Sequence, residues 1–316
     1  MSIDRDLKVE TILVTPGRMP FGPGRLARSP AARPWSCMVE VPQGPATFRR
    51  AVLDGRKAEH PFWRDGPSGT HQMHCLRVGD FYATETDITA IRLERCLLYN
   101  GVADGLYVVG PATVKAVGST FVGSNRNDVS IVHPGANTSF SRCRFGRWDL
   151  EVDTPHVDGE KVWRGHHLLS RCRLGTLEIG SRQGEVVTLS NCRITDRVNI
   201  ASTGQAFGAA VNLKMTDMSQ CSFWLGQSPG LLTATDCKMP AETIITFRTR
   251  YYAPPDPQKV TFNGCVWPKG AILKINSEGT VVINGRRPDR IFISGYAGAT
   301  IVHNGVSTHY PTVQWI

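Results

Sequence analysis

The sequence has no apolar run that approaches the roughly 20 residues of a membrane-spanning helix, so we expect no membrane insertion. Its nine cysteines include no Cys-x-x-Cys pair, which excludes a zinc ribbon and a thioredoxin-like redox motif. Few segments repeat apolar residues at intervals of three and four, so helices should be scarce. Charged residues from Asp4 to Glu10 stand where an export signal would need an apolar stretch, and we expect no Sec export.

A concentrated basic segment is also absent. Lys and Arg total 36 against 27 Asp and Glu, which gives a formal charge of +9. Residues 1–70 carry +4 of this charge and the other 246 residues carry +5. A nucleic-acid-binding domain normally concentrates its charge, so the diffuse excess predicts no nucleic-acid partner.

A repeat centred on a small residue runs through most of the chain. Apolar residues stand five and three positions before the centre and two positions after it, as Ile91, Leu93 and Leu98 do around Cys96. In the sixth copy the two preceding positions fall on Thr216 and Met218. Eight copies occur, centred on Cys96, Ser119, Cys143, Cys172, Cys192, Cys221, Cys237 and Cys265. Copies at intervals of about 20 to 30 residues with variable insertions are typical of a solenoid.

Each copy is followed by a second apolar segment with a period of two, such as Leu106–Val108 or Val129–Ile131. Turn pairs such as Asn100-Gly101 join the segments, so each coil should consist of strands and turns. Equivalent residues of stacked coils lie about 4.8 Å apart. The central cysteines should therefore form a buried column of free thiols. No role is predicted for Cys37 and Cys75, which lie outside the column.

The repeat resembles the right-handed parallel β-helix of the pectin-lyase-like superfamily, especially the minor tail proteins and tailspikes of bacteriophages. Two motifs add to the resemblance: Asn125-Arg126 before the strand Val129–Ile131, and Asp149-Leu150-Glu151-Val152 one coil later, with Val152 where the family usually has Pro. The resemblance implies an all-β, single-stranded right-handed solenoid. It also implies a virion component that assembles in the host cytoplasm.

The ends of the chain differ from the repeat. Residues 1–36 contain several Pro and Arg residues, which predict an extended N-terminal arm. This arm is either a surface tail or a segment that docks onto a neighbouring virion protein. Residues 37–70 should cap the first coil, residues 71–305 should form the β-helix, and residues 306–316 should form a C-terminal tail or cap.

Acidic residues form the strongest candidate for chemistry. Asp149, Glu151 and Asp153 alternate along one strand, so their side chains should share a face at a spacing of about 6.6 Å. That spacing overlaps the carboxylate separation of inverting glycosidases. The coil alignment also predicts that Asp128 stacks beside Asp149, which would raise one pKa. Arg126 would orient a sugar carboxylate or sulfate.

Two other interpretations of these carboxylates remain open. They suit Ca²⁺, which takes several oxygen ligands, although we expect no cofactor. They also suit a purely structural role, because Asp residues that follow turns often cap backbone N–H groups. For an enzyme, the catalytic set would be Asp128, Asp149 and Glu151.

A basic stripe is the second candidate. Residues beside the column cysteines should point outward because the cysteines point inward. The cations at these places are Arg142, Arg144, Arg171, Arg173, Arg193 and Lys238. The stripe is either a solvated face or a docking surface for an anionic glycan or a neighbouring virion protein.

Two hypotheses for the function follow. The first is a non-catalytic tail, fibre, spike or decoration protein of a virion, assembled as a homo-oligomer, most simply a trimer, that binds subunits or a host-surface glycan. The second is a polysaccharide hydrolase, lyase or depolymerase. Because one fold serves many activities, the fold alone does not decide between the two hypotheses.

Overall fold

The computed structural model describes residues 7–9, 12–13, 24–28, 37–56, 74–80, 88–152, 157–158, 161–162, 165–180, 185–201, 209–226, 232–247, 259–276, 279–294, 298–311 and 313–316. Within them every regular element is a β-strand, and no helix is present that could cross a membrane. The chain divides into two compact units. Unit 1 comprises Met1–Glu151 and His156–His166, and unit 2 comprises Val152–Pro155 and His167–Ile316.

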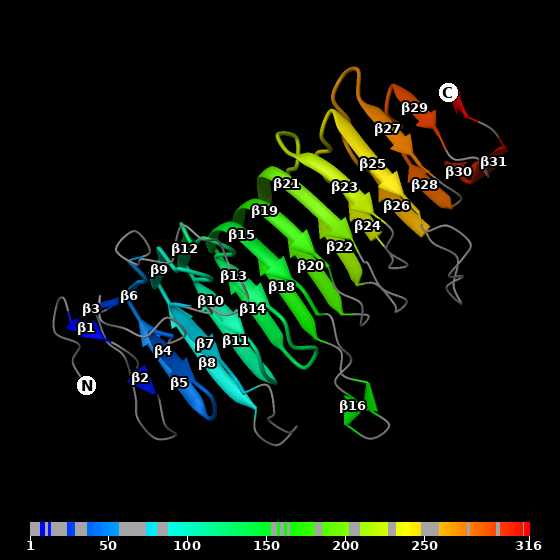
Figure 1. Ribbon diagram of the computed structural model, residues 1–316. Helices are drawn as coiled ribbons and strands as arrows, with labels where there is room; N and C mark the ends of the chain where they lie inside the picture. The colour runs from blue at the N-terminus through cyan, green and yellow to red at the C-terminus, as the bar shows by residue number, and fades with distance from the viewer. Residues whose placement is uncertain are drawn as a thin grey trace. The chain divides into compact units, whose positions relative to one another are not determined.

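Unit 1 is a stack of coils whose equivalent strands pair in parallel (Figure 1). The first stack consists of β5 (Pro45–Arg49), β8 (Thr89–Glu94), β11 (Ala112–Val117) and β14 (Asn137–Ser141). Along these strands the burial alternates, as in β8, where Ile91 and Leu93 are buried and Arg92 is exposed. One face thus builds the core and the other carries charge.

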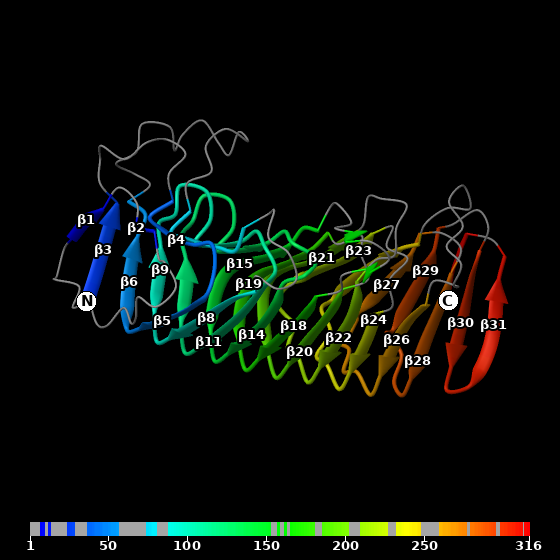
Figure 2. The same ribbon diagram turned by 90° about the horizontal axis from the view of Figure 1, so that it is seen from below.

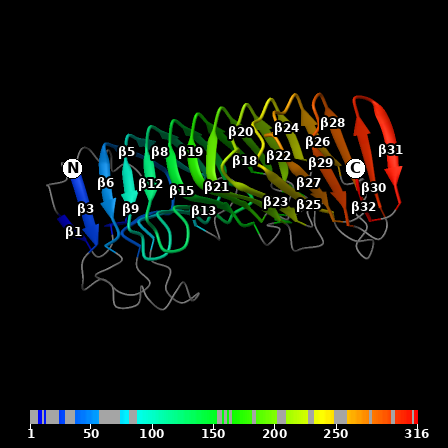
Figure 3. The same cartoon turned by 90° about the horizontal axis from the view of Figure 1, so that it is seen from above.

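Two further stacks complete unit 1. Figure 3 shows strands of the second stack. The second stack consists of β3 (Gly24–Arg28), β6 (Ala51–Asp54), β9 (Leu97–Tyr99), β12 (Thr120–Val122) and the start of β15 (Arg144–Leu150). The end of β15 belongs to the third stack, where Trp148 pairs with Val129. The other strands of that third stack are β2 (Ile12–Leu13), β4 (Val39–Val41), β7 (Leu76–Val78), β10 (Leu106–Val108) and β13 (Val129–Ile131).

The core of unit 1 is made of columns of apolar side chains. One column runs through Leu26, Leu53, Leu98, Phe121 and Phe145, which pair in register on successive coils. The rings of Phe121 and Phe145 stack with their centroids 5.3 Å apart. Burying such side chains contributes about 1.5–3 kcal/mol each relative to leaving them exposed, and this burial holds the coils together.

The predicted N-terminal arm and cap contain strands where the structure describes them. β1 (Leu7–Val9) pairs in parallel with β3, and β3 pairs in parallel with β6. Residues 37–56 supply β4, β5 and β6, which pair with the strands of the following coil. Both segments are extended, and they add coils to the solenoid ahead of residue 71.

Unit 2 repeats the same architecture (Figure 2). Two strand series stack in parallel, and each is closed by an antiparallel strand: β30 (Ala299–His303) pairs with β31 (Val306–Tyr310), and β29 (Arg290–Ile293) with β32 (Gln314–Trp315). One series consists of β18 (His166–Ser170), β20 (Val186–Ser190), β22 (Ala210–Lys214), β24 (Leu232–Thr235), β26 (Lys259–Asn263), β28 (Thr280–Asn284) and β30.

The other series of unit 2 consists of β19 (Arg173–Ile179), β21 (Arg193–Ala201), β23 (Ser222–Gly226), β25 (Glu242–Thr246), β27 (Ile272–Ile275) and β29. A small antiparallel hairpin, β16 (Val157–Asp158) with β17 (Lys161–Val162), belongs to unit 1. The predicted parallel β-helix is therefore confirmed in both units.

The central residues of the repeat form the expected buried columns, and none of the nine cysteines is in a disulfide. Their thiols also donate hydrogen bonds to the preceding coil. Cys96 Sγ lies 3.2 Å from the carbonyl oxygen of Phe48, and in unit 2 Cys192 Sγ lies 3.4 Å from that of Leu169. Ser119 makes the same contact with Leu93, at 3.4 Å. A small donor at this place thus links several of the coils to the previous one.

The predicted centre of the sixth copy is wrong. Leu213 pairs with Leu189 of the preceding coil, so the residue three positions after it, Thr216, occupies the column and is buried. Cys221 lies five residues further on and donates a hydrogen bond to Met218 O instead. The error arose because Met218 precedes Cys221 at the spacing of the repeat.

Candidate functional site

The structure makes Asp128 a cap for backbone groups of unit 1. Its Oδ1 accepts the N–H of Ser124 at 2.9 Å, and its Oδ2 accepts the N–H of Arg147 at 2.8 Å. The carboxyl group is buried, and burial raises its pKa despite the hydrogen bonds to backbone N–H groups, which oppose the shift. A Cβ on Gly146 would lie only 2.3 Å from Asp128 Oδ2, so glycine is required there. The structural interpretation of Asp128 matches this geometry.

Asp149 does not stack beside Asp128. It pairs in register with Ser130, which in turn pairs with Tyr107, so the predicted neighbour is wrong by two residues. The coil alignment matched Leu150 with Val129, whereas the structure pairs Leu150 with Ile131. Asp149 is buried, and its Oδ2 accepts a hydrogen bond from Asn127 Nδ2 at 2.8 Å. The two carboxylates therefore form no shared acid–base pair.

Arg126 binds a carboxylate that the sequence analysis did not single out. Its Nε lies 3.0 Å from Asp104 Oδ1, and its Nη2 contacts Asp104 Oδ2. The backbone N–H of Asn127 donates to Asp104 Oδ1 as well, at 3.1 Å. Asp104 Oδ2 also lies 2.9 Å from Nδ1 of His74, a residue that is almost completely buried. The only sequence signal for Asp104 was its place in an Asp-Gly turn pair.

Together these residues form a polar spine, which we define as His74, Asp104, Arg126, Asn127 and Asp149. Its members come from four successive coils, just before β7, β10 and β13 and within β15. A chain of hydrogen bonds and ion pairs links each coil to the next. The spine extends the coil-to-coil pairing of the backbone into the side chains.

The electrostatics of the spine favour a neutral His74 and an ionised Asp104. Burial lowers the pKa of His74 below its ordinary value, although Asp104 opposes this. Burial alone would raise the pKa of Asp104, but its contacts with His74 and Arg126 lower it. The His74 ring also stacks on Tyr107, with the centroids 4.0 Å apart and the planes at 14°. His74 is thus a buried neutral ring whose Nδ1 lies beside a carboxylate that is paired with arginine.

The remaining acidic candidates lie at the margin of this region. Glu151 is exposed. Burial would lower the pKa of Arg126, but Asp104 raises it and the charge of Glu151 adds a smaller contribution. The Arg126 side chain keeps 30% of its surface accessible. Asp153 lies outside the described residues. In the part of the chain that the structure describes, no group of three or more His, Cys, Asp or Glu side chains is arranged to hold a metal ion. Of the predicted ligand-binding residues, Arg126 and Glu151 are the two that a soluble ligand would meet.

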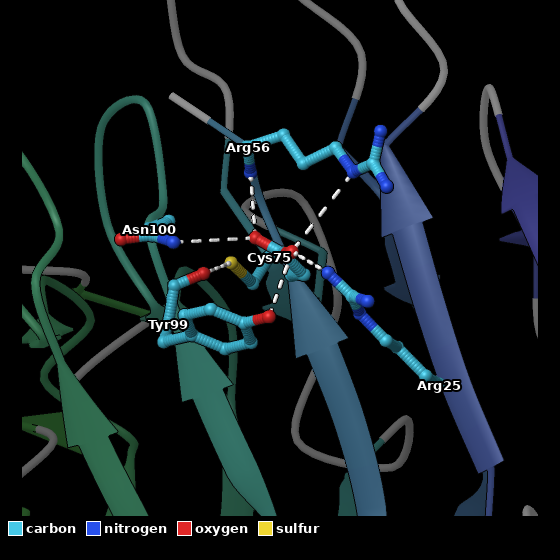
Figure 4. A network of polar contacts seen from close by, with 6 residues as sticks. Arg25, Arg56, Cys75, Tyr99 and Asn100 are labelled. Carbon is cyan, nitrogen blue, oxygen red and sulfur yellow. Dashed lines mark hydrogen bonds and ion pairs between the residues drawn. The ribbon is translucent and has the colours of Figure 1, made fainter. Parts of the chain in front are cut away.

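A second polar cluster surrounds the buried Asp54, as Figure 4 shows. Asp54 Oδ2 accepts hydrogen bonds from Arg25 Nη2 at 2.6 Å and from the Tyr99 hydroxyl at 2.7 Å. Asp54 Oδ1 accepts the N–H of Arg56 at 3.0 Å and Asn100 Nδ2 at 3.4 Å. Burial would raise the pKa of Asp54, but these hydrogen bonds lower it.

The Asp54 cluster joins three coils, because Arg25 belongs to β3, Asp54 to β6 and Tyr99 to β9. Cys75 lies beside it and donates from Sγ to the Tyr99 carbonyl at 3.5 Å (Figure 4). In the sequence, Arg25 is one of several arginines within residues 1–36. No repeat or motif marked its partner, because the two residues are 29 positions apart.

The basic stripe is outward-facing as predicted. Arg142 and Arg144 in unit 1 are exposed, and Arg171, Arg173, Arg193 and Lys238 in unit 2 are exposed as well. In unit 2 the stripe is interrupted, because Asp217 pairs in the ladder between Arg193 and Lys238. Whether the stripe docks a partner stays a prediction.

No protein-family model, curated protein or solved structure matches the chain. The site is thus interpreted from its geometry. The buried carboxylates are satisfied by the chain itself, while the exposed groups available to a ligand or a partner are mainly cations.

Proposed function

We propose that this chain is a structural component of a virion, such as a phage tail, fibre, spike or decoration protein, whose β-helix surface docks subunits or binds a receptor glycan. The main support is that Asp128 and Asp149 are buried and hydrogen-bonded within unit 1. Carboxylates engaged in this way stabilise turns and are not placed to meet a sugar. The exposed stripe of arginines suits docking.

The test is the assembly state of the protein and its presence in particles. We expect light scattering of the full chain to give a discrete homo-oligomer, in the simplest case a trimer. We also expect specific antibodies to label assembled particles in electron micrographs. A monomer at high concentration together with unlabelled particles would overturn the proposal.

The alternative, a carbohydrate-active enzyme, draws on one observation. Burial raises the pKa of Asp128, as a general acid requires, and the exposed Glu151 lies close enough to Arg126 to affect its pKa. In that case Glu151→Gln should abolish the release of new reducing ends or unsaturated products from a glycan panel, while folding stays intact. A wild-type chain that gives no product on the same panel would end this alternative.

A further inference from the structure

One side of unit 1 carries a dense group of cations, of which the predicted stripe is only a part. We call this group the arginine face. It consists of Arg49, Arg50, Arg92, Arg95, Lys115, Arg142 and Arg144, all of them exposed. In the described part of the chain its one acidic neighbour on these strands is Glu94, which forms ion pairs with Arg49 and Arg92. Six positive charges remain uncompensated there.

Three of these arginines form a column at the turn that follows the first strand stack. Arg50, Arg95 and Arg142 occupy the same place on their coils, and Gly118 fills that place on the coil between Arg95 and Arg142. The backbone N–H of Arg50 donates to Glu94 O at 2.8 Å, and that of Arg95 donates to Val117 O at 2.9 Å. Coils stacked about 4.8 Å apart place the column over about 14 Å of the surface.

The column is costly for the backbone. The φ angles of Arg50, Arg95 and Arg142 are 52°, 53° and 54°, which lie in the left-handed region. A side chain with a Cβ costs about 1–2 kcal/mol there, and glycine and asparagine are the usual choices. Folding itself does not require arginine, because Gly118 serves in the same stack and Asn191 serves at the equivalent place in unit 2. Arg171, Met215 and Asp236 also adopt the left-handed conformation at this place in unit 2, so the turn accepts several side chains and folding does not select arginine.

The composition of the face favours a protein partner. Six of the seven cations are arginine, the residue that is enriched in protein interfaces, where lysine is depleted. Val117, which is 45% exposed, lies among them and offers the apolar contact that a protein surface can match. The described outward residues of β5, β8, β11 and β14 include no aromatic ring on which a base or a sugar could stack.

We propose that the arginine face docks an acidic protein surface, with Asp and Glu carboxylates of the partner bound by the guanidinium groups. Planar carboxylates match the two parallel N–H groups of arginine. The chain has a formal charge of +9, so an acidic partner is also favoured over a second copy. This inference rests on the proposed docking function and names the chemistry of one docked partner.

The experiment compares two triple variants of the full-length protein. The face variant carries Arg50→Gly, Arg95→Gly and Arg142→Gly. The control variant carries Arg197→Ser, Lys214→Ser and Arg287→Ser in unit 2, three exposed cations outside the basic stripe, and thus loses the same charge. Binding of labelled poly-L-glutamate is measured at physiological ionic strength, beside a heparin fragment and a DNA duplex of equal charge.

We expect the face variant to bind poly-L-glutamate at least about tenfold more weakly, and the control variant to change by less than about threefold. The face variant should also melt at the same or a higher temperature, because glycine relieves the left-handed strain. An equal loss of binding in both variants would show a diffuse charge effect and overturn the proposal.

Two other results would overturn the proposal as well. One is a heparin fragment or duplex that binds about tenfold more tightly than poly-L-glutamate and loses this affinity in the face variant. The other is a face variant that melts lower, since the arginines would then be structural. The binding measurement uses the purified chain, whereas the virion proposal is tested by the assembly state and by the labelling of particles. One proposal can therefore fail while the other stands.

Discussion

The two units share one architecture but treat polar side chains differently. Unit 1 buries four carboxylates in its described residues, those of Asp54, Asp104, Asp128 and Asp149. Unit 2 buries only Glu185 in the part that the structure describes. The same stacking of strands therefore works with several buried carboxylates and with one. In unit 1, His74 and Arg126 from the turns lie against the ring of Tyr107 in β10.

Close backbone contacts in unit 1 explain the difference. A Cβ on Gly105 would lie 2.6 Å from the Asp128 carbonyl oxygen, and one on Gly101 would lie 2.4 Å from that of Asp104. Turns packed this tightly shield the polar groups beneath them, and a shielded polar group must find partners within the protein. Glycine at these turns thus permits the close packing that covers the buried carboxylates of unit 1.

The largest expected effect comes from Asp104→Ala, which leaves His74 and Arg126 without their carboxylate. Breaking a buried ion pair from one side should lower the free energy of unfolding by about 3–5 kcal/mol. Urea denaturation gives the size of the loss, and hydrogen exchange should place it in β7 and β10. The matched control is Asp217→Ala in unit 2, which should cost at most about 1 kcal/mol because that site is a surface one. Similar losses in both variants would remove the distinction between the units.

Gly146→Ala tests the Asp128 cap. The added Cβ would displace Asp128 Oδ2, and the loss of its backbone hydrogen bonds should cost about 1–3 kcal/mol. Gly226→Ala in unit 2 is the control, because the nearest atoms to its Cβ belong to the Trp224 ring, a side chain that is 41% exposed and can shift more easily than a carboxylate bound to the backbone. Thermal melting of both variants gives the decrease in melting temperature for each. Equal decreases would show that the Asp128 cap contributes nothing special.

The pH dependence of unit 1 should reflect His74. Its folded pKa is lowered by burial, so the unfolded chain takes up a proton first as the pH falls below about 6.5. The free energy of unfolding should therefore decrease from about pH 6.5 downward, and it should decrease less in His74→Gln. Urea midpoints of both proteins at pH 7.5 and 5.5 give the comparison. A variant that loses as much stability as the wild type would show that His74 does not contribute.

The smallest effect is expected within the thiol columns. Ser119 already replaces cysteine in unit 1 and keeps the hydrogen bond to the preceding coil, so Cys143→Ser should cost about 1 kcal/mol or less. Thr216→Cys should be similarly mild in unit 2. A loss above about 2 kcal/mol in either variant would show that the columns do not tolerate exchange, contrary to the sequence pattern.

The fold could be predicted from the sequence because the repeat places apolar residues on one face of each strand, at fixed numbers of positions from a small residue. This local regularity located the central residue of every copy except the sixth. There Thr216 is the central residue, but Met218 and Cys221 have the spacing of the repeat. The polar clusters were not readable. Arg25 and Asp54, or His74 and Asp104, lie 29 and 30 positions apart, and only the exact register of the coils brings them together.

The contacts of Asp54 have a consequence for how unit 1 comes apart. Its carboxylate binds side chains of the coils on both sides. If β3 detached, the Asp54 carboxylate would lose Arg25 while it was still largely shielded from water, which is unfavourable. Detachment of β3 would thereby loosen Tyr99, which lies two coils further along the stack. Fraying at this end should accordingly proceed in steps of several coils, and a protease would find few intermediate states to cut.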